Sequence, residues 1–99
     1  MHKIRSEETD KLFDAILSLK DKDECYSFFE DICTIKELRD LSLRLVVASM
    51  LKAGMSYQEV TKETGVSAAT ICRVNKCLMY GDGYKMVLER REDTVNEDK

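Results

Sequence analysis

The 99-residue sequence contains no proline and no tryptophan, and it has a single histidine and four glycines. Because proline breaks helix interiors, its absence is typical of a chain that is mostly helical. The one histidine, His2, stands beside the N-terminus, which leaves no residue for a histidine-centred catalytic triad. The segment Gly81-Asp82-Gly83 lacks the further glycines and the Lys-Ser/Thr pair of a phosphate-binding loop. We therefore predict that the protein is not an enzyme and holds no metal or resident cofactor.

The sequence also lacks a long apolar run and a secretion signal. Its longest apolar stretch, residues 45–51, is far too short to span a bilayer. Residues 1–10 are charged and lack the apolar centre of a signal peptide. We expect a cytoplasmic protein without membrane contact, in which cysteines stay reduced. No CxxC pair is present, and three cysteines are expected to be small buried hydrophobes: Cys25, Cys33 and Cys77.

Apolar residues recur at helical spacing through the first third of the chain. They predict one helix over about 7–20 and a second after the polar break Asp21-Lys22-Asp23. No internal repeat or low-complexity segment interrupts the pattern that follows. We predict a single all-helical domain over residues 1–91. Residues 92–99 are polar and acidic, and they are expected to form a disordered tail.

A long helix is predicted next. Thr34 and Glu37 stand three residues apart, which is the spacing of a capping box at a helix N-terminus. The apolar pattern continues to about Lys52, and Gly54 can end the helix in a left-handed conformation. Apolar residues occupy several faces of this helix, so it is expected to be covered on several sides. In so short a chain, that pattern favours a homodimer in which a second subunit supplies some of the cover.

Two shorter helices follow, and they form a predicted helix-turn-helix at about residues 56–79. Ser56 and Glu59 make a second capping box. Gly65 stands where a sharp turn needs a positive φ angle, and Ser67 can cap the next helix. Two short helices joined by a glycine-containing turn are the arrangement that places a helix in the major groove of DNA.

The second of these helices, about residues 68–79, has two distinct faces. Ile71, Val74 and Leu78 share one face and are expected to be buried. The opposite face carries small residues and then cations: Ala69, Cys72, Arg73 and Lys76. Thr70 can hydrogen bond to DNA, while the two cations can reach guanine or phosphate. Although the whole chain has a net charge of −3, residues 52–91 hold seven basic and four acidic side chains, which favours double-stranded DNA as the partner.

A helix-turn-helix can also serve as a protein-interaction module, and the overall acidity of the chain would suit that role. The two functions differ in their response to salt. Binding through several phosphates weakens steeply as salt rises, whereas an apolar protein interface does not.

The helix-turn-helix resembles the DNA-binding segment of the Trp repressor family. The residues that carry the resemblance are Met55-Ser56, Glu59, Glu63, Gly65 and the run Ala69-Thr70-Ile71-x-Arg73. The runs Arg73-Val74-Asn75-Lys76 and Tyr80-Gly81-Asp82-Gly83-Tyr84 are similar to the YerC/YecD-type branch of that family. The resemblance implies an intertwined all-helical homodimer, a palindromic operator and a role in transcription regulation. Repression is expected, because so small a domain has little room for an activating surface.

The resemblance also implies which residues would contact DNA. Positions expected to face the bases are Ser67, Ala68, Ala69, Thr70 and Cys72. Positions expected near the DNA backbone are Tyr57, Gln58 and Thr61. Together with Arg73 and Lys76, these residues form the predicted DNA-binding set.

In the repressor proper, L-tryptophan is the co-repressor and lies between an arginine of the long helix and an arginine of the recognition helix. Arg73 matches the second arginine. The first aligns without a gap to Leu43, with Arg44 beside it, so Arg44 and Arg73 are the candidate effector residues. Val74 replaces a small glycine and Cys77 replaces a serine near the expected indole. We predict that tryptophan is not used, and a tryptophan-dependent repressor remains the alternative.

Overall fold

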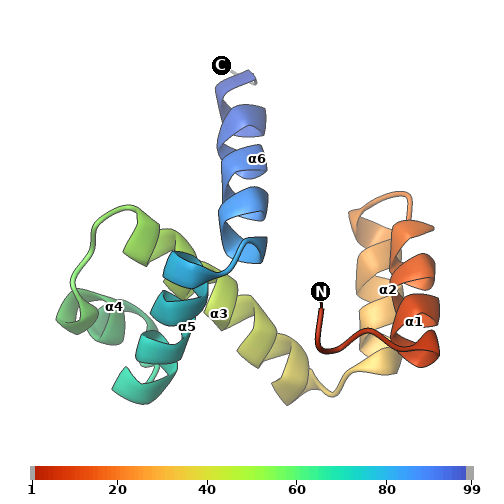
Figure 1. The fold of residues 1–99 in the computed structure, drawn as a ribbon, viewed down its shortest axis with the longest axis horizontal. Coiled ribbons are helices and arrows are strands. Elements are labelled where there is room, and N and C mark those ends of the chain that lie inside the picture. Colours follow the sequence, from red (N-terminus) through yellow and green to blue (C-terminus); the bar gives the residue numbers. More distant parts are fainter. Residues whose placement is uncertain (1, 98–99) are drawn as a thin grey trace. The chain divides into compact units, whose positions relative to one another are not determined.

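The computed structural model describes residues 2–97, and over that range the chain forms helices and no strand (Figure 1). The predicted all-helical fold class is confirmed. The helices are α1 (Glu7–Leu17), α2 (Lys22–Ile32), α3 (Ile35–Lys52), α4 (Tyr57–Thr64), α5 (Ala68–Tyr80) and α6 (Gly83–Glu97). None of the helices in this range is long and apolar enough to cross a membrane.

Local hydrogen bonds set the ends of α3. The backbone N–H of Thr34 donates to Glu37 Oε1 at 2.9 Å, and the N–H of Glu37 donates to Thr34 Oγ1 at 3.1 Å. These are the two reciprocal bonds of the predicted capping box. Gly54, two residues beyond the C-terminal end of α3, has a φ angle of 94°. The predicted start and end of the long helix are both confirmed.

Contacts within the chain divide it into two compact units, Met1–Leu38 and Arg39–Lys99. The sequence had predicted one domain over residues 1–91. In the first unit, neither α1 nor α2 contains a buried residue. Phe28 and Phe29 in this unit have ring centroids 5.6 Å apart in an edge-to-face arrangement. The first unit therefore has little core of its own.

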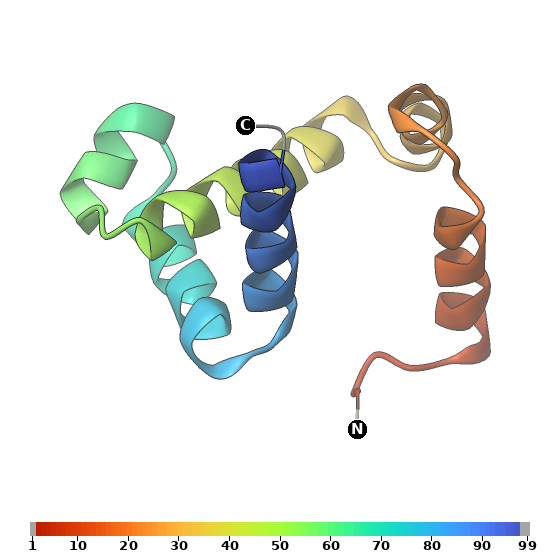
Figure 2. The same cartoon turned by 90° about the horizontal axis from the view of Figure 1, so that it is seen from above.

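The second unit contains the hydrophobic core of the described chain. α3, α4, α5 and α6 each contribute to it, and Figure 2 shows α5 turning sharply into α6. The buried side chains are Val47, Ala48, Val60, Ile71, Val74, Leu78 and Leu88. This core fixes the helix-turn-helix to the second half of α3.

Three expectations about exposure differ from the structure. α3 buries Val47 and Ala48, while Leu41 on the same helix is 47% exposed. Within one chain, α3 is therefore not covered on several sides. Cys25 and Cys77 are exposed, so the expectation that they are buried hydrophobes is wrong, and Cys33 is half-buried. Periodicity places a residue on a helix face, but it does not say whether another element covers that face.

α6 extends to Glu97, so the backbone of residues 92–97 is helical where the sequence predicted a disordered tail. The physical reason is that no proline or glycine follows Gly83, and nothing local stops the helix. Residues 98–99, the rest of that predicted tail, lie outside the described residues.

Candidate nucleic-acid interface

The first helix of the interface, α4, begins at a complete capping box. The N–H of Glu59 donates to Ser56 Oγ at 3.2 Å, and the N–H of Ser56 donates to Glu59 Oε1 at 3.1 Å. The bond from the Ser56 backbone, helped by its side chain, lowers the pKa of Glu59. The corresponding bonds from Thr34 lower the pKa of Glu37. Both carboxylates satisfy N–H groups that would otherwise have no partner at a helix start.

These lowered pKa values predict how stability depends on pH. A carboxylate whose pKa is lower in the folded chain stabilises the fold above its unfolded pKa, and this contribution is lost as pH falls through the folded value. Lowering the pH below about 4.5, the ordinary pKa of a glutamate, should therefore begin to weaken both capping boxes. In the double variant E37Q/E59Q, glutamine can accept the same bonds without titrating. The free energy of unfolding, measured with urea, should fall less between neutral pH and about pH 3 in this variant than in the wild type. An equal fall in both proteins would contradict the stabilising role of the two charged carboxylates.

The turn between α4 and α5 depends on Gly65, whose φ angle is 73°. The Gly65 N–H donates the last helical hydrogen bond to the carbonyl oxygen of Thr61 at 2.8 Å, and the left-handed conformation then turns the chain away from the helix. Thr64 fastens the same turn, because its hydroxyl donates to the Val60 carbonyl at 2.7 Å and accepts from the Val66 N–H at 3.2 Å. Thr64 was not among the residues predicted from the sequence, although its place directly before the turn glycine was a usable signal.

Gly65→Ala should lower the free energy of unfolding by about 1–2 kcal/mol, because a residue with a side chain resists the left-handed region. A Cβ at position 65 would meet no heavy atom within 4 Å, so steric overlap adds nothing to this cost. Gly83→Ala is a matched control, because its Cβ also meets open space and its φ angle is not in the positive range. It lies at the start of α6, where alanine should be neutral or stabilising. Equal losses in urea unfolding for the two variants would contradict a conformational role for Gly65.

The second helix of the candidate interface, α5, is capped by Ser67, whose Oγ accepts from the Thr70 N–H at 3.3 Å. Its apolar stripe is buried as predicted: Ile71 is 0% exposed, Val74 2% and Leu78 9%. The stripe attaches α5 to the core, and Figure 1 shows α4 and α5 meeting at the short turn between them. The opposite face of α5 is therefore turned away from the core and is available for contact.

Most of the predicted DNA-binding residues are exposed on α4, on α5 or in the turn between them. The exposed members of the set are Tyr57, Gln58, Thr61, Ser67, Ala68, Ala69, Cys72, Arg73 and Lys76. Thr70 differs, because it is half-buried and its hydroxyl accepts from the Ser67 hydroxyl at 3.1 Å. The small residues at the start of α5 leave its backbone open to close approach. The cations follow one and two turns later.

One hollow beside the helix-turn-helix includes only one of the two candidate effector arginines. Arg44 and Thr70 border a hollow of about 280 Å³ between α3 and the turn of the helix-turn-helix, together with Leu43 and Ser67. Arg73 is not part of its lining. Among the described residues, no group of three or more His, Cys, Asp or Glu side chains could hold a metal ion.

Comparison with known proteins identifies the family. Residues 7–92 match the family model described as Trp repressor protein. The chain belongs to the Trp repressor family. It is 53% identical over 96 residues to protein YerC of Bacillus subtilis (strain 168), covering 96% of this chain and 92% of the relative. The predicted similarity to the YerC-type branch is thus confirmed.

Solved structures of two relatives share the fold. A TrpR-like protein from Eubacterium eligens ATCC 27750 is 50% identical, with a TM-score of 0.86 and coverage of 91% of this chain and 94% of that chain. A candidate Trp repressor from Staphylococcus aureus is 47% identical, also with a TM-score of 0.86, and 91% of each chain is covered. The Trp repressor family consists of regulatory proteins, and at family level the match supports a DNA-binding regulator.

Proposed function

We infer that this member of the Trp repressor family is a sequence-specific regulator of transcription that binds double-stranded DNA, most simply as a repressor. The observation that carries the inference is the arrangement of α5. One face, with Ile71, Val74 and Leu78, is fixed in the core, while the opposite face presents small residues followed by Arg73 and Lys76 to solvent. A rigid helix with a free small-then-basic face can enter the major groove and contact base edges and phosphates.

A homodimer is the second part of this proposal. α1 and α2 each have 11 residues, and helices of that length are marginal in water without packing partners. Their apolar side chains nevertheless stay open to solvent in a single chain: Phe13 is 46% exposed, Tyr26 58% and Ile32 47%. A second copy that covers these side chains would supply the missing core. Two identical chains would also present two α5 helices, which suits a palindromic operator.

Selection of binding sites from a random pool of DNA duplexes tests this function. The full-length protein is used at fixed salt, with and without millimolar L-tryptophan. We expect a palindromic site to be enriched equally in both conditions. Enrichment only with tryptophan would identify a tryptophan-dependent repressor. No enrichment in either condition would overturn DNA binding and favour a protein-interaction module, whose partner affinity should change little with salt. A DNA target also implies a cytoplasmic location.

A further inference from the structure

The corner between α5 and α6 is held by three hydrogen bonds. The Gly81 N–H donates to the Cys77 carbonyl at 2.9 Å, and the Met86 N–H donates to the Asp82 carbonyl at 3.0 Å. Lys85 Nζ reaches back to the carbonyl oxygen of Met79 at 3.0 Å, near the C-terminal end of α5. A Cβ at position 81 would lie 2.8 Å from the Cys77 carbonyl oxygen, so this corner also requires glycine. The bond from Lys85 to Met79 consequently joins the first turn of α6 to the C-terminal end of α5.

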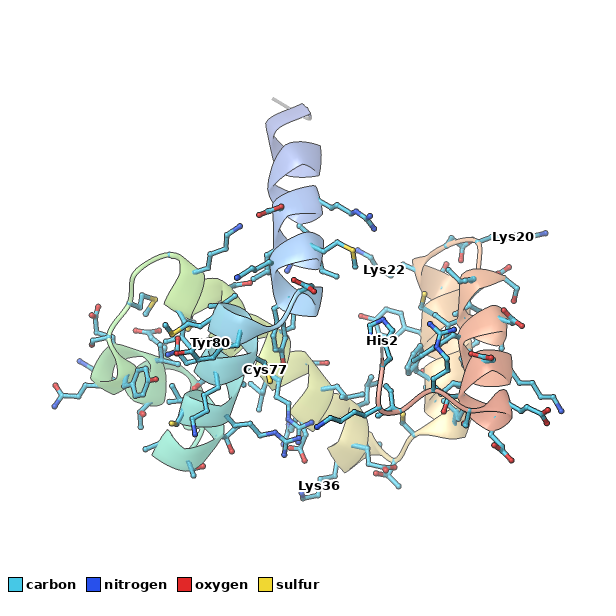
Figure 3. All side chains as sticks on the ribbon, viewed as in Figure 1. His2, Lys20, Lys22, Lys36, Cys77 and Tyr80 are labelled. Atoms are coloured by element: carbon cyan, nitrogen blue, oxygen red, sulfur yellow. The ribbon has the colours of Figure 1, made fainter. Side chains whose placement is uncertain are left out.

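Tyr84 stands on this turn and points into the second unit. Its side chain is half-buried and packs against the hydrophobic core. It also borders an apolar hollow of about 460 Å³, together with Leu45 of α3 and Cys77 of α5. Figure 3 labels Cys77 and, as a useful contrast, the neighbouring Tyr80, which is 84% exposed. Tyr84 is therefore the tyrosine of this corner that joins α3, α5 and α6.

The charges of the two candidate effector arginines act on the phenol of Tyr84. Burial raises the pKa of the phenol and the neighbouring Cys77 raises it further, while the charges of Arg44 and Arg73 act in the opposite direction. Arg73 and Cys77 are four residues apart and thus share one face of α5. Leu45, which borders the same hollow as Tyr84, is the residue next to Arg44 on α3. The aromatic ring consequently lies where α3, α5 and α6 meet, beside Leu45 and Cys77.

We propose that Tyr84 is a built-in aromatic group that positions the recognition helix, in place of a diffusible aromatic effector. This proposal rests on the proposed DNA-binding function and extends that function to the question of regulation. A free aromatic molecule must lose its freedom of motion on binding, whereas a ring already fixed on α6 is preorganised. With the ring permanently present, α5 is held ready for DNA at every tryptophan concentration. Tyr84 is a positioning residue, and DNA contact belongs to the exposed face of α5.

Removing the ring and restoring it from solution tests the proposal. In Tyr84→Ala the side chain is replaced by open space, and 4-methylphenol is the missing group as a free molecule. We expect DNA affinity to fall about tenfold or more in this variant and to recover in part with millimolar 4-methylphenol. Tyr84→Phe should stay close to wild type, since the ring is kept. Tyr80→Ala is the matched control, because it removes an exposed tyrosine from the same corner and should leave affinity unchanged.

A second measurement needs no DNA. 4-methylphenol should raise the thermal unfolding midpoint of Tyr84→Ala in a saturable way and leave the wild-type midpoint unchanged. If Tyr84→Ala does not fold, Tyr84→Leu keeps an apolar group of intermediate size. We then expect Tyr84→Leu to lose DNA affinity where Tyr84→Phe does not.

Several results would overturn the proposal. One is that folded Tyr84→Ala, or Tyr84→Leu, binds DNA as tightly as the wild type. Another is that 4-methylphenol does not bind Tyr84→Ala. A third is that added tryptophan makes the wild type bind DNA more tightly. None of these would remove the DNA-binding function itself. Conversely, a wild-type protein that enriches no DNA site would contradict the proposed function, and the DNA-free measurement would still test the place of the ring.

Discussion

Replacing Arg73 and Lys76 together by alanine is expected to reduce operator affinity about a hundredfold or more and to leave the oligomeric state unchanged. Both side chains are exposed on α5, opposite the stripe that is buried in the core. Their removal therefore costs the fold little, since exposed positions seldom change stability by more than about 0.5 kcal/mol. A contact of an arginine or lysine with a base or phosphate contributes about 1–3 kcal/mol, and a dimer would make each contact twice.

The salt dependence of binding separates this effect from a general loss of affinity. Each lost phosphate contact should reduce the slope of log affinity against log salt by about 0.9, so the loss of two to four contacts should be easy to measure by fluorescence anisotropy. The double variant K11A/K20A is the matched control. It removes the same charge from the first unit, where both lysines are exposed, and should change affinity far less. Equal losses for the two double variants would contradict α5 as the DNA-reading helix.

Features of the fold that depend on local hydrogen bonds could be predicted from the sequence. Ser56 and Glu59 lie three residues apart, and their side chains satisfy each other's backbone N–H groups whatever the rest of the chain does. Gly65 could be assigned to a turn because few other residues adopt a positive φ angle without cost. The stripe of Ile71, Val74 and Leu78 followed from helical spacing alone.

Features that depend on packing between distant segments could not be predicted. Cys77 lies on a regular helix, and whether a neighbour covers it is decided by the path of α6. Tyr84 belonged to a short motif that pointed to a branch of the family, but nothing in its spacing placed its ring beside the same hollow as Leu45, 39 positions earlier in the chain. The half-burial of Thr70 likewise depends on the hollow that it shares with α3. Such positions follow from tertiary structure, which overrides local patterns.

The division of the chain into two units has a consequence for stability. The first unit contains two short helices that bury no residue, and α3 leaves Leu41 47% exposed. If a second copy covers these surfaces, folding and dimerisation are coupled. The thermal unfolding midpoint should then rise with protein concentration, because mass action favours the assembled state. A thermal unfolding midpoint that stays constant over about a hundredfold range of protein concentration would show that the chain folds without a partner.

Leu41→Gln should have a large effect in a dimer and a small one in a monomer. In a single chain the side chain is already half exposed, and the substitution should cost about 1 kcal/mol. In a dimer interface the substitution would remove a buried leucine and leave an amide without a hydrogen-bond partner. It should then cost about 2–4 kcal/mol per chain, which is about 4–8 kcal/mol per dimer.

Arg39→Gln is the matched control for Leu41→Gln, since Arg39 lies two residues away on α3, is exposed and receives the same new side chain. We expect sedimentation to show monomers for Leu41→Gln at concentrations where Arg39→Gln and the wild type are dimers, and operator binding should be lost along with the dimer. Dimers of unchanged stability for Leu41→Gln would exclude this face of α3 from the interface, because no amide could be buried there without a partner at so little cost.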